Sequence, residues 1–110
     1  EEIRDPFLLK YFKTMIDLIN IKILVRLKRI KSDGMTLQEA IFPGGNLSQE
    51  LLLELFPRDI EDIVEALSKT DYHKVVETGL STWGKTGSLA TFEKMSDDYL
   101  LGLARKGMAL

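Results

Sequence analysis

Residues 5–31 read DPFLLKYFKTMIDLINIKILVRLKRIK, and this stretch decides the fold because it predicts one long helix with clear boundaries. Asp5 can accept a hydrogen bond from a free backbone N–H of the first turn, and Pro6 fits the first helical position, where an N–H is not needed. Basic residues in the last turn complement the partial negative charge of a helix C-terminus. We expect Gly34 to take the left-handed conformation that closes the helix.

Steps of about 100° per residue place most apolar side chains of this helix on one main stripe. The stripe consists of Leu8, Phe12, Ile16, Ile19, Ile23, Leu27 and Ile30. Around the middle of the helix, other apolar residues fill much of the remaining surface, which predicts a central helix enclosed by others. Two polar residues interrupt the apolar face, because Arg26 projects into the stripe and Asn20 lies at its edge.

A guanidinium on an apolar stripe needs either a carboxylate partner or a path to solvent along its own stem. The partner that we predict for Arg26 is Glu93, near the start of a second long helix, which requires the two long helices to be antiparallel. Lys22, Arg26 and Arg29, at positions i, i+4 and i+7, form a candidate surface for contact with another protein. The simpler interpretation of these charges is complementation of the helix dipole and solubility.

The remaining sequence predicts shorter helices between proline and glycine breaks, followed by the second long helix. The expected helices cover 36–42, 49–56, 59–67, 70–78 and 88–105, and the expected exposed loop covers 79–87. Thr36 and Glu39 are predicted to form a capping box. Ser48 is predicted to cap the helix at 49–56, and Gly79 to end the helix at 70–78. No sustained alternation with period 2 occurs, so the predicted class is all-α, a bundle of two long and several short helices.

Composition is that of a globular module without a nucleic-acid partner. The 110 residues are 45% hydrophobic, and 15 basic against 17 acidic residues give a net charge of −2, which does not suit a phosphate-neutralising surface. No apolar run is long enough to span a membrane, because charged residues interrupt each one. Since the chain starts at Glu1 without a methionine, we expect residues 1–110 to be a single module excised from a longer protein.

Residues 79–86 (GLSTWGKT) match the phosphate-binding pattern G-x-x-x-x-G-K-[ST] letter for letter. That chemistry needs a strand leading into the loop and a helix that begins at the Lys-Thr pair, so that its N-terminus faces the phosphate. Here Gly87 opposes helix growth after Thr86, and no apolar strand ending in Asp is available to hold magnesium. A phosphate-loop nucleotide-binding enzyme therefore stays only an alternative hypothesis, and we expect no nucleotide and no other cofactor.

Other candidate residues do not form a recognisable site. His73 is the only histidine, so a metal site would need carboxylates for its other ligands, and we expect no metal. Asp97 and Asp98 point about 100° apart on a helix, which suits solvent better than shared-proton chemistry. Trp83 either contacts a partner or folds back on the bundle, and the sequence leaves both open. We predict no catalytic residue.

Four stretches, in this order and at these separations, resemble the C subunit family of V-type (A/V-type) ATP synthases and ATPases, whose eukaryotic member is called the d subunit. They are 17–22 (DLINIK) continuing to 25–26 (VR), 42–47 (FPGGNL), 69–72 (KTDY), and 92–93 (FE) with 98–100 (DYL). The resemblance covers about residues 5–103, and family chains are considerably longer. Asp17, Asn20, Arg26 and Glu93 would be structural residues of the family motif.

The resemblance implies a non-catalytic protein of three related helical bundles arranged as a funnel. Such a protein sits on the proteolipid ring at the cytoplasmic face of the membrane, receives the foot of the central rotor stalk, and couples ATP chemistry to proton or sodium transport. Nucleotides are bound by other subunits of that assembly. The alternative from another class is a generic helical adaptor that binds a partner helix through the leucine-rich segment 51–56.

Overall fold

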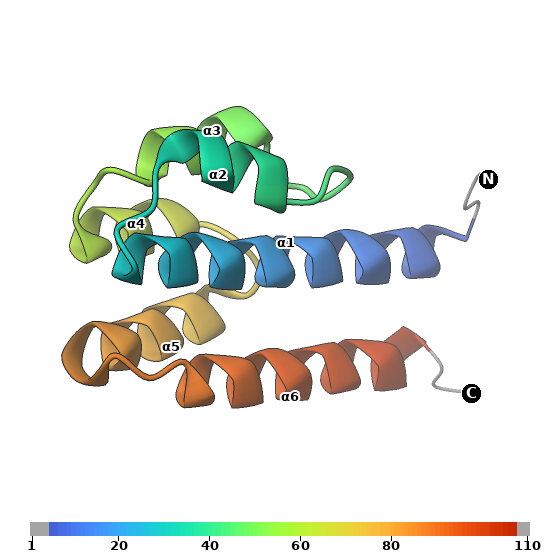
Figure 1. Cartoon of the computed structure of the whole chain (residues 1–110). Coiled ribbons are helices and arrows are strands. Elements are labelled where there is room, and N and C mark those ends of the chain that lie inside the picture. The colour runs from blue at the N-terminus through green and yellow to red at the C-terminus, as the bar shows by residue number, and fades with distance from the viewer. Residues whose placement is uncertain (1–4, 108–110) are drawn as a thin grey trace.

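The computed structural model describes residues 5–107, and this part of the chain folds into helices without a strand (Figure 1). The helices are α1 (Pro6–Arg29), α2 (Gly34–Ala40), α3 (Gln49–Leu55), α4 (Ile60–Leu67), α5 (His73–Thr86) and α6 (Ala90–Gly107). The predicted all-α bundle class is therefore confirmed. Figure 1 shows the long helices α1 and α6 running antiparallel, with α2 and α3 on one side of α1 and α5 and α6 on the other.

The start of α1 is the predicted one, but its end is closed differently. Asp5 accepts a hydrogen bond from the Phe7 N–H at 2.9 Å, and Pro6 is the first helical residue. At the other end Lys31, not Gly34, takes the left-handed conformation, with a φ of 57°. The N–H of Ser32 then reaches back to a carbonyl of the last turn, which satisfies an acceptor that the helix leaves free.

Gly34 instead begins α2, so the predicted capping box at Thr36 is wrong. The cap of α2 is Asp33, whose carboxylate accepts hydrogen bonds from the N–H and the hydroxyl of Thr36, at 2.9 and 2.8 Å. The backbone hydrogen bond lowers the pKa of Asp33 below its ordinary value. For α3 the predicted cap is confirmed, because Ser48 Oγ accepts from the Leu51 N–H at 3.1 Å.

The predicted loop at 79–87 is also wrong, because α5 continues through Gly79 and Gly84 and ends at Thr86. A Cβ atom at position 79 would lie 2.8 Å from the Phe92 Cα, so the glycine lets α5 approach α6 closely. This packing outweighs the roughly 1 kcal/mol by which glycine disfavours a helix interior. The glycine that ends α5 is Gly87, in the left-handed conformation with a φ of 75°.

The side of α1 that the bundle buries is opposite to the predicted apolar stripe. Ile21, Leu24 and Val25 are fully buried. The other buried residues of α1 are Thr14, Asp17, Leu18 and Asn20. Among the stripe residues, Leu8, Phe12 and Ile30 are 42%, 38% and 71% exposed, and the others are only half-buried. The helix turns Asp17 and Asn20 inward because each has a hydrogen-bonding partner there.

The core joins all the helices into one cluster around the inner side of α1. Its buried members outside α1 are Leu37, Ile41, Leu52, Leu55, Phe56, Ile63, Leu67, Tyr72, Val75, Val76, Leu80, Trp83 and Phe92. Within residues 5–107, no helix combines the length and the apolarity that a bilayer crossing requires.

Candidate functional site

The phosphate-binding pattern at 79–86 does not form a phosphate loop, because it lies within α5. Its backbone N–H groups belong to helical turns and cannot curl around an anion. The Thr86 hydroxyl donates to the Thr82 carbonyl at 2.9 Å and accepts from the Ser88 N–H at 3.1 Å, so it closes the helix end. The geometry that nucleotide binding requires is absent from this segment.

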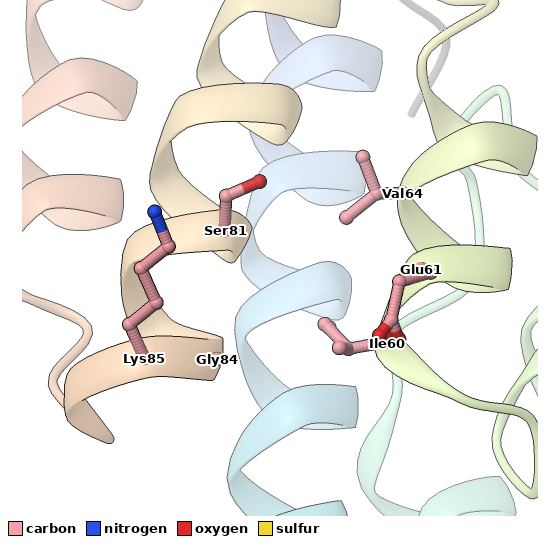
Figure 2. Close-up of a pocket in the computed structure, with 6 residues that line it drawn as sticks. All are labelled: Ile60, Glu61, Val64, Ser81, Gly84 and Lys85. Atoms are coloured by element: carbon pink, nitrogen blue, oxygen red, sulfur yellow. The ribbon is translucent and has the colours of Figure 1, made fainter.

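The outward side of the same segment borders an open groove between α4 and α5, about 390 Å³ in volume (Figure 2). The groove is lined by Ile60, Glu61, Val64, Ser81, Gly84 and Lys85. Figure 2 shows the residues of α4 facing those of α5 across it, with Lys85 on the α5 side and Glu61 on the α4 side. Its lining combines a small apolar wall with one charge of each sign, so it offers no constellation for catalysis.

The buried polar residues of α1 hold the rest of the chain in place, and Asp17 is the central one. Its side chain is completely buried. Oδ1 accepts a hydrogen bond from the Leu47 N–H at 2.9 Å, and Oδ2 accepts one from the Tyr72 hydroxyl at 2.5 Å. A buried carboxylate is costly unless it is hydrogen-bonded, so both partners are needed for the fold.

Asn20 is the second buried polar residue, with 1% of its surface exposed. Its Nδ2 donates to the Phe42 carbonyl and its Oδ1 accepts from the Phe42 N–H, both at 2.8 Å. The side-chain amide thus pairs with a backbone residue in the way that a neighbouring strand would. The loop after α2 receives through Asn20 the hydrogen bonds that it cannot form internally.

The glycines of residues 42–47 let this loop approach α1. A Cβ atom at Gly45 would collide with Asp17 Oδ1, so a larger residue would displace the carboxylate from its partners. Gly44 has a φ of 100°, which side-chain-bearing residues rarely adopt. The Pro-Gly-Gly run is therefore a docking segment for the inner side of α1.

Tyr72 links this network to the last helix. Its hydroxyl donates to Asp17, while its ring packs edge-on against Tyr99 with a centroid distance of 6.0 Å. Burial and, next, the hydrogen bond to Asp17 raise the pKa of Tyr72 well above its ordinary value of 10.0. Burial also raises the pKa of Tyr99. Both hydroxyls therefore stay protonated under ordinary conditions.

The predicted pair between Arg26 and Glu93 is present, but it lies at the surface. Arg26 Nη2 is 3.6 Å from Glu93 Oε2, and Lys22 Nζ is 3.3 Å from the same oxygen. The Arg26 side chain is 60% exposed, so it has both the carboxylate partner and the access to solvent that the sequence offered as alternatives. This three-residue contact joins α1 to α6 from outside, whereas Asp17 and Asn20 act from inside.

Arg29, the last residue of the predicted contact line, lies elsewhere. Its guanidinium covers Gly87 at the turn between α5 and α6, where a Cβ atom would collide with it. Its neighbour Lys28 donates to the Phe56 carbonyl at 3.0 Å. The structure therefore brings Lys22 and Arg26 together at Glu93 and places Arg29 apart from them.

The other candidate residues take structural or solvent-facing positions. Trp83 folds into the bundle and is 9% exposed, which decides between the two possibilities that the sequence left open. His73 is exposed at the start of α5, and Asp97 and Asp98 are exposed on α6. Within residues 5–107, no group of three or more His, Cys, Asp or Glu side chains is arranged to hold a metal ion.

Sequence reasoning missed the role of Tyr72 and the hydrogen bonds that the loop makes. The signal was available in part, because the Pro-Gly-Gly run at 43–45 has few internal hydrogen-bonding options and needs partners from elsewhere in the chain. The partner of Asp17 was not visible, since it follows 55 residues later. All four stretches that carry the family resemblance contribute residues to this network or to the Glu93 contact.

The fold and this network define an all-α helical module whose buried polar side chains fix backbone segments. The chain belongs to the ATP synthase (C/AC39) subunit family, whose family model matches residues 1–109. This is the C subunit family of A/V-type ATP synthases, with the eukaryotic d subunit among its members, to which the four stretches point.

Several relatives bear the name of this family. The C subunit of the A-type ATP synthase of Methanothermobacter thermautotrophicus is 35% identical over an alignment of 100 residues that covers 86% of this chain and 25% of the relative. Its counterpart in Methanocaldococcus jannaschii is 33% identical over an alignment of 99 residues that covers 89% of this chain and again 25% of the relative. The chain thus spans about a quarter of the length of these relatives. No solved structure gave a significant match.

Proposed function

We propose that this chain is a module of a non-catalytic central-stalk subunit of a V-type ATP synthase or ATPase. That protein couples the rotor stalk to the membrane proteolipid ring during ATP-linked proton or sodium transport, as a peripheral protein on the cytoplasmic face. The observation that carries the proposal is the network of Asp17, Asn20, Phe42, Leu47 and Tyr72, because it joins three of the four stretches that resemble the family.

The physical role of the network in this proposal is stiffness. A coupling protein transmits torque only if its body does not deform under load, and hydrogen bonds to a buried carboxylate are stronger than those between neutral groups. Here they tie α1 to the loop after α2 and to the start of α5, while Lys22, Arg26 and Glu93 tie it to α6. The module would therefore turn as one body.

In this proposal the residues have two roles, and Lys22, which also pairs with Glu93, takes part in both. Asp17, Asn20, Arg26 and Glu93 hold the bundle together, and Lys22 and Arg29 contribute to contacts with other subunits. The rotor stalk and the proteolipid ring are the expected partners. No nucleotide, other cofactor or nucleic acid is expected to bind.

The two alternative hypotheses find little support in the structure. An adaptor that binds through segment 51–56 would need its leucines accessible, but Leu52, Leu55 and Phe56 are buried in the core. A phosphate-loop enzyme would need a loop where α5 is helical. Of the leucines in 51–56, only Leu51 and Leu53 stay half-buried at the surface, and 79–86 forms no phosphate cradle.

Co-purification of the tagged protein that carries this module, under mild detergent, tests the proposal. We expect stalk and proteolipid-ring subunits to be retained together. Charge reversal by Lys22→Glu with Arg29→Glu should reduce their retention, whereas Lys74→Glu, on the exposed start of α5, should not. Purification without any ATPase component would contradict the proposal.

A further inference from the structure

A polar pocket lies where three segments that are distant in the sequence meet. It is open to solvent and about 390 Å³ in volume. It is lined by Lys10 and Thr14 of α1, by Asn46 of the loop after α2, and by residues 69–72 (KTDY) between α4 and α5. Of these side chains, only Tyr72 takes part in the network around Asp17. The pocket therefore contains polar side chains that the network does not use.

The lining of the pocket carries an excess of positive charge. Lys10 and Lys69 are exposed, and neither ammonium group has a salt-bridge partner within residues 5–107. The acidic residue of the lining is Asp71. Burial and, next, the charge of Asp71 raise the pKa of Tyr99, so this carboxylate lies toward α6. Two ammonium groups against one carboxylate favour an anion in the pocket.

A buried hydroxyl group opens onto the same pocket. Thr14 is only 3% exposed, yet its side chain is part of the lining. The side chains of α1 that form hydrogen bonds within residues 5–107 are Asp17, Asn20, Lys22 and Lys28. The Thr14 hydroxyl is also not among the polar atoms that the bundle seals from solvent, so it reaches the pocket. It gains a partner when a ligand with oxygen atoms enters.

The pocket adjoins the start of α5, which has no side-chain cap. Tyr72 occupies the cap position, but its hydroxyl donates to Asp17 and makes no capping hydrogen bond. The first turn of α5 contains no acidic residue. The free N–H groups and the partial positive charge of a helix start favour anions, phosphate groups among them. Because residues 70–72 line the pocket and lead directly into α5, this partial charge adds to that of the two lysines.

We infer that this pocket binds a phosphate group, either as inorganic phosphate or as the headgroup of a phospholipid. Lys10 and Lys69 neutralise its charge from two different segments of the chain, and Thr14 and Asn46 donate hydrogen bonds to its oxygens. The volume of the pocket also admits the organic part of a phosphate ester. The inference does not rest on the proposed function, because it uses no contact with another subunit.

NMR spectra of the isotope-labelled chain, recorded during titration with sodium phosphate, test the inference. Sodium chloride at matched ionic strength controls for general screening. We expect saturable shifts of the Asn46 side-chain amide and of the backbone amides of Thr70 and Asp71. The binding should weaken as salt is added, because the attraction is between charges.

Matched variants locate the anion. Lys10→Gln with Lys69→Gln removes both positive charges at exposed positions and should weaken phosphate binding at least about tenfold. Lys85→Gln is the control, since Lys85 is also exposed but lines the groove between α4 and α5. It also belongs to the phosphate-binding pattern at 79–86, so the control separates the pocket from that pattern.

A third variant tests the buried hydroxyl group. Thr14→Val removes the hydroxyl with little change of shape, and we expect about a tenfold loss of affinity. Urea denaturation shows whether this variant keeps the fold. If it does not, the two exposed lysines still decide the question, because their replacement does not disturb the core.

Vesicles distinguish the two sources of the phosphate group. If the ligand is a lipid headgroup, the chain should sediment with phosphatidylcholine vesicles that contain phosphatidic acid, and inorganic phosphate should release it. Saturable shifts with inorganic phosphate, without sedimentation on these vesicles, would assign the pocket to the free ion. Both results support a phosphate site, and each requires the loss in the double lysine variant.

Three results would overturn the inference. The first is the absence of both saturable shifts and sedimentation with the vesicles. The second is an equal loss of binding in Lys85→Gln and in the double lysine variant. The third is a set of shifts spread over every lysine of the surface, which would show an adventitious ion only. The assay contains no other ATPase subunit, so its failure leaves the co-purification result intact.

Discussion

The inner side of α1 buries polar side chains among apolar ones, whereas its outer side exposes apolar side chains beside charged ones. The inner side buries Asp17 and Asn20 in the centre of the bundle, whereas the outer side leaves Leu8, Phe12 and Ile30 exposed. The side of a helix that becomes buried depends on the partners available there, and two loops offer hydrogen-bonding groups to Asp17 and Asn20. Apolar area alone does not decide the orientation when buried polar groups have specific partners.

The largest effect on this comparison is expected from the central carboxylate. Asp17→Ala leaves the Leu47 N–H and the Tyr72 hydroxyl unsatisfied inside the bundle. We expect the free energy of unfolding, measured by urea denaturation, to fall by about 2 to 6 kcal/mol, because each of the two buried donors left unsatisfied costs about 1 to 3 kcal/mol. Asp98→Ala, at an exposed site on α6, is the control and should change it by less than about 0.5 kcal/mol. Equal effects of the two variants would show that the network around Asp17 does not stabilise the fold.

The next largest effect concerns the close approach of the loop to α1. Gly45→Ala pushes a methyl group into Asp17 Oδ1 and should cost about 2 kcal/mol, within the range of overpacking. At Gly102 of α6 nothing lies within 4 Å of the added methyl group, so Gly102→Ala should stabilise the chain by up to about 1 kcal/mol. Thermal melts of both variants measure the difference. A melting temperature of Gly45→Ala equal to or above that of the unchanged chain would show that the loop does not need its glycine at position 45.

High pH should weaken the inner side selectively. Burial and the contact with Asp17 raise the pKa of Tyr72 in the folded chain, while an unfolded tyrosine titrates near 10.0. The stabilisation is therefore complete below pH 10 and is lost as the pH rises above it, by up to about 1.4 kcal/mol per pH unit. Urea denaturation from pH 8 to 11 measures this slope. Tyr72→Phe should have a shallower slope, and an unchanged slope would show that Tyr72 does not cause it.

The smallest effect is expected at the outer contact between α1 and α6. Arg26 and Glu93 are 3.6 Å apart and largely exposed, and Lys22 competes for the same oxygen. A double-mutant cycle with Arg26→Ala and Glu93→Ala should give a coupling of about 0.5 kcal/mol that declines with added salt. A coupling comparable with the effect of Asp17→Ala would mean that the outer contact matters as much as the inner network.

The sequence predicted the helices well where the signals are local. Asp5 and Ser48 are caps as expected, because a cap depends only on the next few residues. Gly79 was wrongly predicted to end a helix. A glycine is needed there because Phe92, on another helix, lies too close for a Cβ atom. The stripe of α1 was assigned to the wrong side for a similar reason, since the partners of Asp17 and Asn20 come from distant segments.

For the candidate site, the sequence identified the residues but not their arrangement. The family resemblance singled out Asp17, Asn20, Arg26 and Glu93, and the pairing of the last two was predicted from charge alone. Spacing along the chain could not show that Tyr72 would reach Asp17, because that contact depends on how α5 begins. Side-chain hydrogen bonds between distant segments depend on how the chain folds, so spacing along the sequence does not predict them.

Amide hydrogen exchange tests most directly whether the inner side of α1 organises the module. The N–H groups of Phe42 and Leu47 lie outside the helices, and each donates to a buried side chain of α1. We predict that both exchange as slowly as amides in the middle of α1, since only global unfolding exposes them. Exchange of these two amides at the rates of an unprotected loop would contradict a central role for the inner side.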